Sequence, residues 1–129
     1  MNIGKASRAT GVSAKMIRHY ESVGLLESVS RSESGYRIYN IRDLNNLRFI
    51  RKARTLGFTL EDIRLLLGLW QDKHRSSSEV KSLALEHAKE LEHKIEELTE
   101  MRDLLNHLAR SCHGDGRPEC PILDSLADE

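Results

Sequence analysis

Two cysteines near the C-terminus are the side chains of this 129-residue chain best suited to chemistry. Cys112 and Cys120 bracket residues 113–119, a short loop that is rich in glycine and stiffened by proline. Thiolates bind soft metal ions and also form disulfides, so this spacing fits a metal site or a redox pair. The pair lacks the C-x-x-C spacing of thiol oxidoreductases. No nucleophile with an adjacent base stands out, and the chain is predicted not to be an enzyme.

Two histidines near the cysteines keep a second kind of metal site open. His113 directly follows Cys112, and His107 lies five residues before it. With these donors the loop would suit a divalent ion such as Zn²⁺, which prefers four tetrahedral ligands. An exposed loop histidine is more often solvated than bound to a metal, so a two-thiolate site is favoured and the divalent site remains an alternative.

The first twenty residues predict a helix-turn-helix. Small and apolar residues recur at helical spacing in residues 3–10, and Gly11 follows where a C-terminal cap belongs. Ser13 then offers an N-cap for a second helix over residues 14–20, with apolar residues available for packing. In this motif the second helix enters the major groove of DNA. We therefore predict DNA contacts from Lys15, Arg18, His19 and Tyr20.

Residues 31–39 have the pattern of a β-hairpin. A Ser-Glu-Ser-Gly turn separates two short stretches in which apolar and polar residues alternate. A hairpin beside a helix-turn-helix is a wing, and its Arg31, Tyr36 and Arg37 suit phosphate oxygens. The alternative for the hairpin tyrosines is that their side chains cover the core and make no contact with phosphates.

Two further helices are predicted over residues 41–56 and 60–70. Asn40 and Thr59 precede them as caps, and Gly57 separates them. The first of these helices adds to the basic surface through Arg48, Arg51, Lys52 and Arg54.

A long helix over residues 76–109 organises the rest of the chain. Apolar residues recur every seven positions, as in a helix that buries one seam against another helix. Ser76 and Glu79 have the spacing of a capping box. A chain this short has no second helix of matching length, so we predict that the helix pairs with its copy in a homodimer. The seam is predicted to contain Ala84, Leu91, Ile95, Leu98 and Leu105.

Charge is divided unevenly along the chain. Residues 1–75 hold 14 Lys and Arg against 7 Asp and Glu, and residues 76–129 hold 6 against 13. The fold is therefore expected to be mainly α, with a basic winged domain in residues 1–75, a dimerisation helix in 76–110 and a metal loop with a short helix in 111–129. No segment has the length of a membrane span, so a cytoplasmic protein with reduced cysteines is expected.

These motifs together resemble the MerR family of transcriptional regulators. The resemblance rests on the run from Ile17 to Glu21, on Gly24-Leu25, on Leu56-Gly57-Phe58 and on the wing and long helix, and it covers nearly the whole chain. It implies a homodimer with antiparallel long helices on a palindromic double-stranded promoter. It also implies activation by distortion of the promoter DNA for RNA polymerase.

Within that family, the Cys112-x7-Cys120 loop resembles the branch that senses monovalent copper, silver or gold. Two soft thiolates without a third strong donor suit one linear Cu(I), Ag(I) or Au(I) ion per cysteine pair. Sensors of divalent ions in the family carry another cysteine where this chain has Ser77, which makes Ser77 a predicted determinant of metal selectivity. A thiol redox sensor and a coiled-coil adaptor without a role at DNA remain as other hypotheses.

Overall fold

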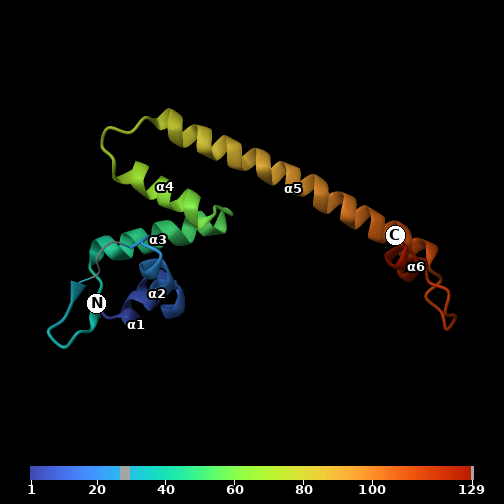
Figure 1. Ribbon diagram of the computed structural model, residues 1–129, viewed down its shortest axis with the longest axis horizontal. Helices are drawn as coiled ribbons and strands as arrows, with labels where there is room; N and C mark the ends of the chain where they lie inside the picture. The colour runs from blue at the N-terminus through green and yellow to red at the C-terminus, as the bar shows by residue number, and fades with distance from the viewer. Residues whose placement is uncertain (27–29, 129) are drawn as a thin grey trace. The chain divides into compact units, whose positions relative to one another are not determined.

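A computed structural model describes residues 1–26 and 30–128 of the chain (Figure 1). The described part is mainly helical, as predicted, and divides into two compact units, Met1–Val80 and Lys81–Glu129. The predicted domain ranges include residues 27–29 and 129, which lie outside the described residues. The boundary between the compact units lies between Val80 and Lys81, and the predicted functional divisions at residues 75 and 110 stay predictions.

The helices follow the predicted ranges to within two residues. The predicted first helix is confirmed without change, the second extends past Tyr20, and the long helix runs from Ser77 to Ser111. In chain order the elements are α1 (Ile3–Thr10), α2 (Ala14–Ser22), β1 (Ser30–Arg31), β2 (Arg37–Ile38), α3 (Ile41–Thr55), α4 (Leu60–Gln71), α5 (Ser77–Ser111) and α6 (Pro121–Ala127).

Local caps define the helix-turn-helix. The Asn2 side chain accepts the Lys5 N–H at 2.9 Å, and the Ser13 side chain accepts the Met16 N–H at 3.2 Å, so both helices begin at capped residues. Between them, Gly11 has φ 77° and donates its N–H to the carbonyl of Ser7. This left-handed conformation favours glycine, and it lets the chain turn from α1 into α2 within a few residues.

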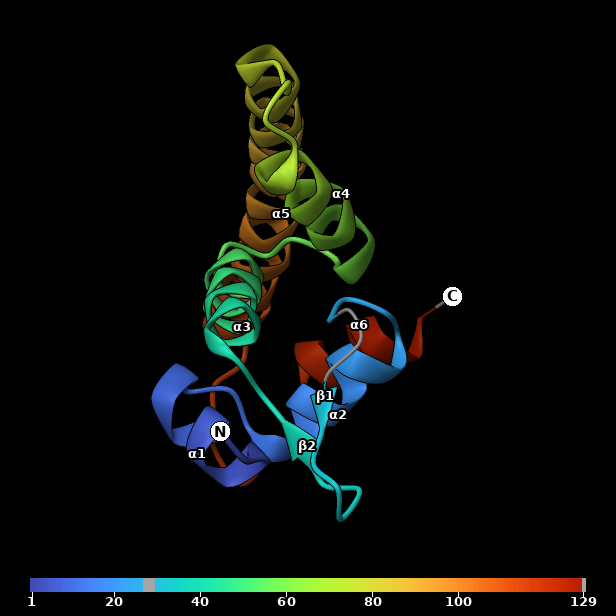
Figure 2. The ribbon, with the colours of Figure 1, turned by 90° about the vertical axis from the view of Figure 1, so that its left-hand side faces the viewer.

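The β1–β2 hairpin lies beside α2 (Figure 2). Its strands are antiparallel, with Ser30 opposite Ile38 and Arg31 opposite Arg37. The turn is closed by the Gly35 N–H, which donates to the Ser32 carbonyl at 2.9 Å. The predicted hairpin and its turn are therefore confirmed.

The core of the first unit lies where α1, α2, α3 and α4 meet. Tyr39, directly after β2, is 1% exposed, and the terminal amine of Met1 donates to its carbonyl at 2.9 Å. The guanidinium of Arg64 on α4 donates to the Val23 carbonyl at the end of α2, and α4 is further held by stacking of Trp70 on Phe49. Together these contacts hold the helices around α2 in place. The largest fully buried side chains of the described residues are Ile17, Tyr39, Leu47, Ile50 and Ile63.

Helix α5 spans 35 residues, or roughly 50 Å at ~1.5 Å per residue. It buries none of its own side chains within the chain. Its start differs from the prediction, because the Ser76 hydroxyl accepts the N–H of Ser78 at 3.2 Å, while the Glu79 N–H donates to the Ser76 carbonyl. The reciprocal capping box predicted for Ser76 and Glu79 is thus replaced by a tighter local turn. No helix in the described ranges is long and apolar enough to cross a membrane.

Candidate metal site and DNA-binding surface

The two cysteines sit at opposite ends of a short loop between α5 and α6. Cys112 follows the last residue of α5, and Cys120 directly precedes α6; both thiols are free and half-buried. Within the loop, the Asp115 carboxylate accepts the Arg117 N–H at 2.9 Å and the Arg117 Nε at 2.8 Å. This clamp shapes the loop between the two sulfurs.

Cys120 occupies the N-cap position of α6, and its side chain makes no capping hydrogen bond. The backbone N–H of Leu123 nevertheless acts on its sulfur and lowers the pKa of the Cys120 thiol, and the Ile122 N–H and the Cys112 thiol act in the same direction. A thiolate at the start of a helix is stabilised by exposed N–H groups. The N–H groups at the start of α6 therefore favour the thiolate form of Cys120.

The described residues bring no set of three or more His, Cys, Asp or Glu side chains together for a metal ion. His107 and His113 are exposed, and the structure gives no support to their joining the cysteine pair. Ser77 lies at the start of α5 in the Met1–Val80 unit, whereas both cysteines belong to the other unit. Its role in selectivity depends on a second copy of the chain and stays a prediction.

Helix α2 presents part of its predicted DNA-binding set. Lys15, Arg18 and His19 are exposed, while Ile17 is fully buried beneath them. The sequence also predicts Tyr20 at the DNA surface, but Tyr20 is only 5% exposed and packs in the core. A buried phenol ring offers little surface to DNA, so Tyr20 packs in the core and its contact with DNA stays a prediction.

The three residues of the hairpin that are predicted to contact phosphates differ in their exposure. Arg31 is exposed and Tyr36 is 75% exposed, so both are accessible to a ligand. Arg37 is half-buried, and its Nε donates to Glu21 Oε1 on α2 at 3.0 Å. The hydrogen bond to Glu21 and its negative charge raise the pKa of Arg37, so the guanidinium remains charged. The Glu21 contact was not predicted, since nothing in a separation of sixteen residues indicates it.

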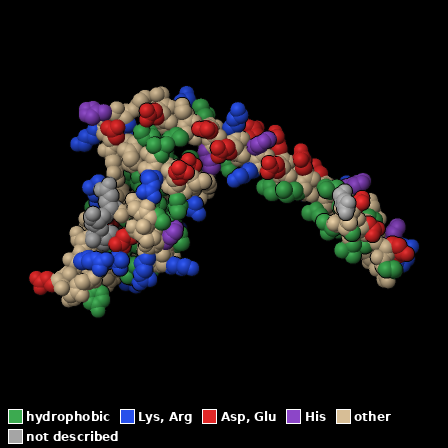
Figure 3. Space-filling view, viewed as in Figure 1, with side chains coloured by type: hydrophobic (Ala, Val, Ile, Leu, Met, Phe, Trp, Pro, Cys, Tyr) green, Lys and Arg blue, Asp and Glu red, His purple; other side chains and the backbone are tan. Residues whose placement is uncertain are grey.

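The predicted seam of α5 is uncovered in the single chain. Leu91 is 38% exposed, and Ile95, Leu98 and Leu105 are 57–62% exposed, with Ala84 also exposed. Hydrophobic side chains gather along this helix in Figure 3. A strip of this kind is expected on a helix whose partner is another chain.

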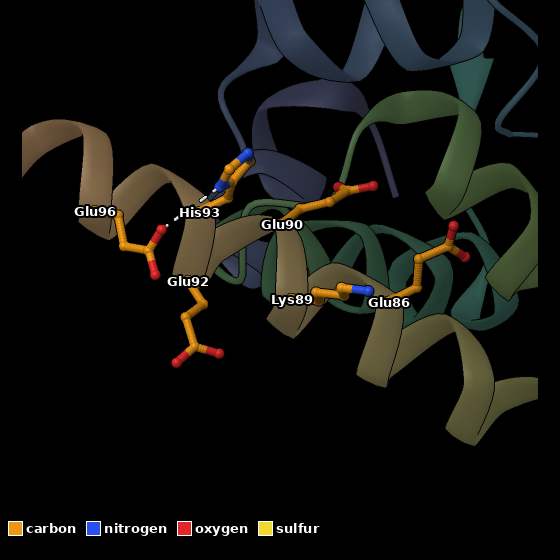
Figure 4. Close-up of a pocket in the computed structure, with 6 residues that line it drawn as sticks. All are labelled: Glu86, Lys89, Glu90, Glu92, His93 and Glu96. Atoms are coloured by element: carbon orange, nitrogen blue, oxygen red, sulfur yellow. Dashed lines mark ion pairs between the residues drawn. The ribbon is translucent and has the colours of Figure 1, made fainter.

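Another part of α5 carries charge instead. Glu86, Lys89, Glu90, Glu92, His93 and Glu96 line a shallow hollow of about 520 Å³, shown in Figure 4. There His93 Nδ1 lies 3.7 Å from Glu96 Oε2. This is a polar helix face with ion pairs three residues apart, and it forms no metal group.

Known families match this arrangement over most of the chain. Residues 1–69 match the family described as MerR HTH family regulatory protein, and residues 44–108 match the family described as MerR, DNA binding. The chain belongs to the MerR family. It is thus a DNA-binding transcription regulator and not an enzyme, as the sequence predicted.

The chain is also similar to three individual transcription regulators. Heavy metal-dependent transcription regulator 2 of Rhizobium meliloti is 55% identical over 99% of this chain and 87% of its own length. The HTH-type transcriptional regulator CueR of Salmonella typhimurium is 46% identical, over 98% and 92%. The transcription regulator PbrR691 of Ralstonia metallidurans, solved in complex with lead(II), is 36% identical with a TM-score of 0.85, over 98% of both chains.

Proposed function

We propose that this MerR-family protein is a copper-type metal sensor that binds a palindromic promoter as a homodimer. One Cu(I), Ag(I) or Au(I) ion is held by Cys112 and Cys120, and the loaded dimer distorts the promoter DNA so that RNA polymerase transcribes metal-resistance genes. The observation that carries the proposal is the pair of free thiols on one short loop, and no third His, Cys, Asp or Glu side chain of the described residues is grouped with them. The protein acts in the cytoplasm, where both thiols are reduced.

The chemistry of the pair favours a monovalent ion. Two thiolates carry a combined charge of −2, which a monovalent ion neutralises only in part. The backbone N–H groups of Ile122 and Leu123, which lower the pKa of the Cys120 thiol, stabilise the remaining negative charge. A divalent ion would neutralise both thiolates fully, yet it would lack ligands to complete its coordination shell.

DNA recognition is assigned to α2 and the wing. Lys15, Arg18 and His19 extend from the exposed face of α2 toward base edges and nearby phosphates, since the second helix of this motif enters the major groove. Arg31 and Tyr36 on the wing contact phosphates. The dimer forms through the exposed seam of α5, which sets the spacing of the two half-sites.

A divalent-metal sensor is the second candidate. The likeness to PbrR691, whose solved structure contains lead(II), favours it. In that case Cys112 and Cys120 would share a divalent ion with further donors, such as His107 or His113 or a group from a second copy. The absence of a cysteine at position 77 argues for the monovalent alternative.

Metal-dependent transcription in a purified system tests the proposal. Reduced protein, its promoter duplex and RNA polymerase are titrated with Cu(I), Ag(I), Au(I), Zn²⁺, Pb²⁺ and Hg²⁺ under anaerobic conditions, with metal binding measured in parallel. We expect activation by the three monovalent ions at one ion per cysteine pair. An equal response to Pb²⁺ or Zn²⁺ would favour the second candidate, and activation by an oxidant without metal would favour a redox sensor.

A further inference from the structure

Beside the turn between α1 and α2, the surface of the first unit is hollow and basic. The hollow measures about 380 Å³ and lies between the end of α1 and the middle of α3. Cations contribute four of its seven lining residues, and no carboxylate contributes any; the lining is Arg8, Ala9, Thr10, Gly11, Arg48, Arg51 and Lys52. The hollow lies outside the DNA-contact set proposed above.

The cations of this hollow have no acidic partners in the part of the chain that the structure describes. Arg8, Arg51 and Lys52 take part in none of its ion pairs. Arg48 donates only to neutral groups, the Ala9 carbonyl at 3.3 Å and the Asn45 side-chain oxygen at 3.4 Å. Four like charges around one hollow repel one another, so an anion bound there would be stabilised.

Two of the arginines contact the turn and the end of α1. Arg48 is anchored on the last turn of α1 through its bond to the Ala9 carbonyl. The guanidinium of Arg51 lies against Gly11, where an added Cβ would come within 2.9 Å of its Cζ and Nη1. The absence of a side chain at Gly11 thus leaves room for the Arg51 guanidinium beside the turn. Both guanidinium groups therefore lie at the hollow, where one anion can contact them.

We propose that this hollow binds a backbone phosphate of duplex DNA. A guanidinium matches the geometry of a phosphate, and in this motif the helix before the reading helix crosses the DNA backbone. Helix α2 begins three residues after Gly11, so DNA bound along α2 brings its phosphates close to the hollow. An acidic protein segment could also bind to these cations, but no observation places one beside the reading helix. This inference rests on the proposed DNA binding and adds a contact to it.

A double variant, Arg48→Gln with Arg51→Gln, tests the contact by the salt dependence of binding. The variant is expected to bind the promoter and an unrelated duplex more weakly by the same factor, because phosphates carry no sequence information. A plot of log K against log salt concentration has a negative slope, and its magnitude should decrease by about 0.9 for each phosphate that the variant no longer neutralises. The matched control is Lys81→Gln with Lys89→Gln on α5, which removes the same charge and should keep the wild-type slope.

Ethylation interference locates the contact on the DNA. In the wild type, ethylation of the phosphate that the hollow binds should weaken binding. In the double variant, ethylation of the same phosphate should leave binding unchanged. If the double variant melts early by circular dichroism, the single variants Arg8→Gln and Lys52→Gln give the same test. A wild type that binds no duplex would refute the proposed function itself. A wild type that binds, with variants of unchanged slope and interference pattern, would refute only the phosphate contact.

Discussion

The guanidinium of Arg37 on β2 holds the carboxylate of Glu21 on α2, with Nε 2.7 Å from Oε2 and 3.0 Å from Oε1. The pair ties the wing to the helix that is proposed to read DNA. The sequence predicts Arg37 only as a phosphate contact. In the folded chain it is also a positioning residue, because its Nε orients the wing relative to α2.

Replacing Glu21 by Gln should therefore weaken DNA binding, although Glu21 itself carries a charge that repels phosphate. The wing loses its charged anchor, and Arg31 and Tyr36 are no longer held in register with α2. A double-mutant cycle with Arg37→Gln measures this by fluorescence anisotropy on a promoter duplex. We expect the double variant to bind little worse than Arg37→Gln alone. Additive losses of affinity would mean that the two residues act independently.

Arg18 is exposed on α2 and is expected to contact a base edge. Arg18→Ala should weaken binding to the promoter by ~1–3 kcal/mol, the range for a bidentate base contact. Binding to an unrelated duplex should change less, because that complex uses phosphates. The measurement compares both duplexes at one salt concentration. An unchanged footprint and affinity would show that α2 does not dock in this way.

The helices and the wing could be predicted from the sequence because their signals are local. Asn2, Ser13 and Asn40 accept the N–H groups that their cap positions require, and Gly11 takes the left-handed conformation of a C-cap. These interactions span three or four residues. The capping box predicted for Ser76 did not form, because its hydroxyl accepts the nearer N–H of Ser78.

Interactions between distant residues could not be predicted in the same way. Tyr20 lies beside exposed Arg18 and His19 in the sequence, yet only the packing of α2 on the core decides that it is buried. The hollow likewise depends on how α3 crosses the end of α1, which brings Arg51 onto Gly11 from forty residues away. In the metal loop, both thiols are evident from residue type and spacing, whereas the action of the Leu123 N–H on Cys120 required the fold.

The seam of α5 yields a prediction about assembly. Leu98→Asp places a charge in the middle of the exposed apolar strip, twice per dimer, where it would be buried without a partner. We expect monomers by light scattering and the loss of tight promoter binding. Lys89→Asp is the matched control, since it introduces the same residue on the polar face in Figure 4 and should leave the dimer intact. A dimeric Leu98→Asp protein would locate the seam elsewhere.

The cysteine loop yields a prediction about sensing that separates metal binding from DNA binding. Cys112→Ser and Cys120→Ser each remove one of two thiolates, and a hydroxyl is a poor ligand for a soft ion. Both variants should lose activation by Cu(I) and keep wild-type affinity for the promoter without metal. Anaerobic transcription and anisotropy measure the two properties side by side. A Cys112→Ser protein that still responds to Cu(I) would move the sensor away from this loop.

Selectivity is expected to depend on Ser77, which stands where divalent sensors of the family carry a cysteine. In an antiparallel dimer, Ser77 of one chain would approach the metal loop of the other, so Ser77→Cys adds a third thiolate to each pair. A third thiolate helps to complete the shell of a divalent ion, and the response should therefore widen toward Zn²⁺, Pb²⁺ or Hg²⁺. Ser78→Cys, one position along α5, is the matched control and should keep the wild-type selectivity. The prediction fails if Ser77→Cys and Ser78→Cys respond alike to every ion in the titration, because position 77 would then have no special access to the metal.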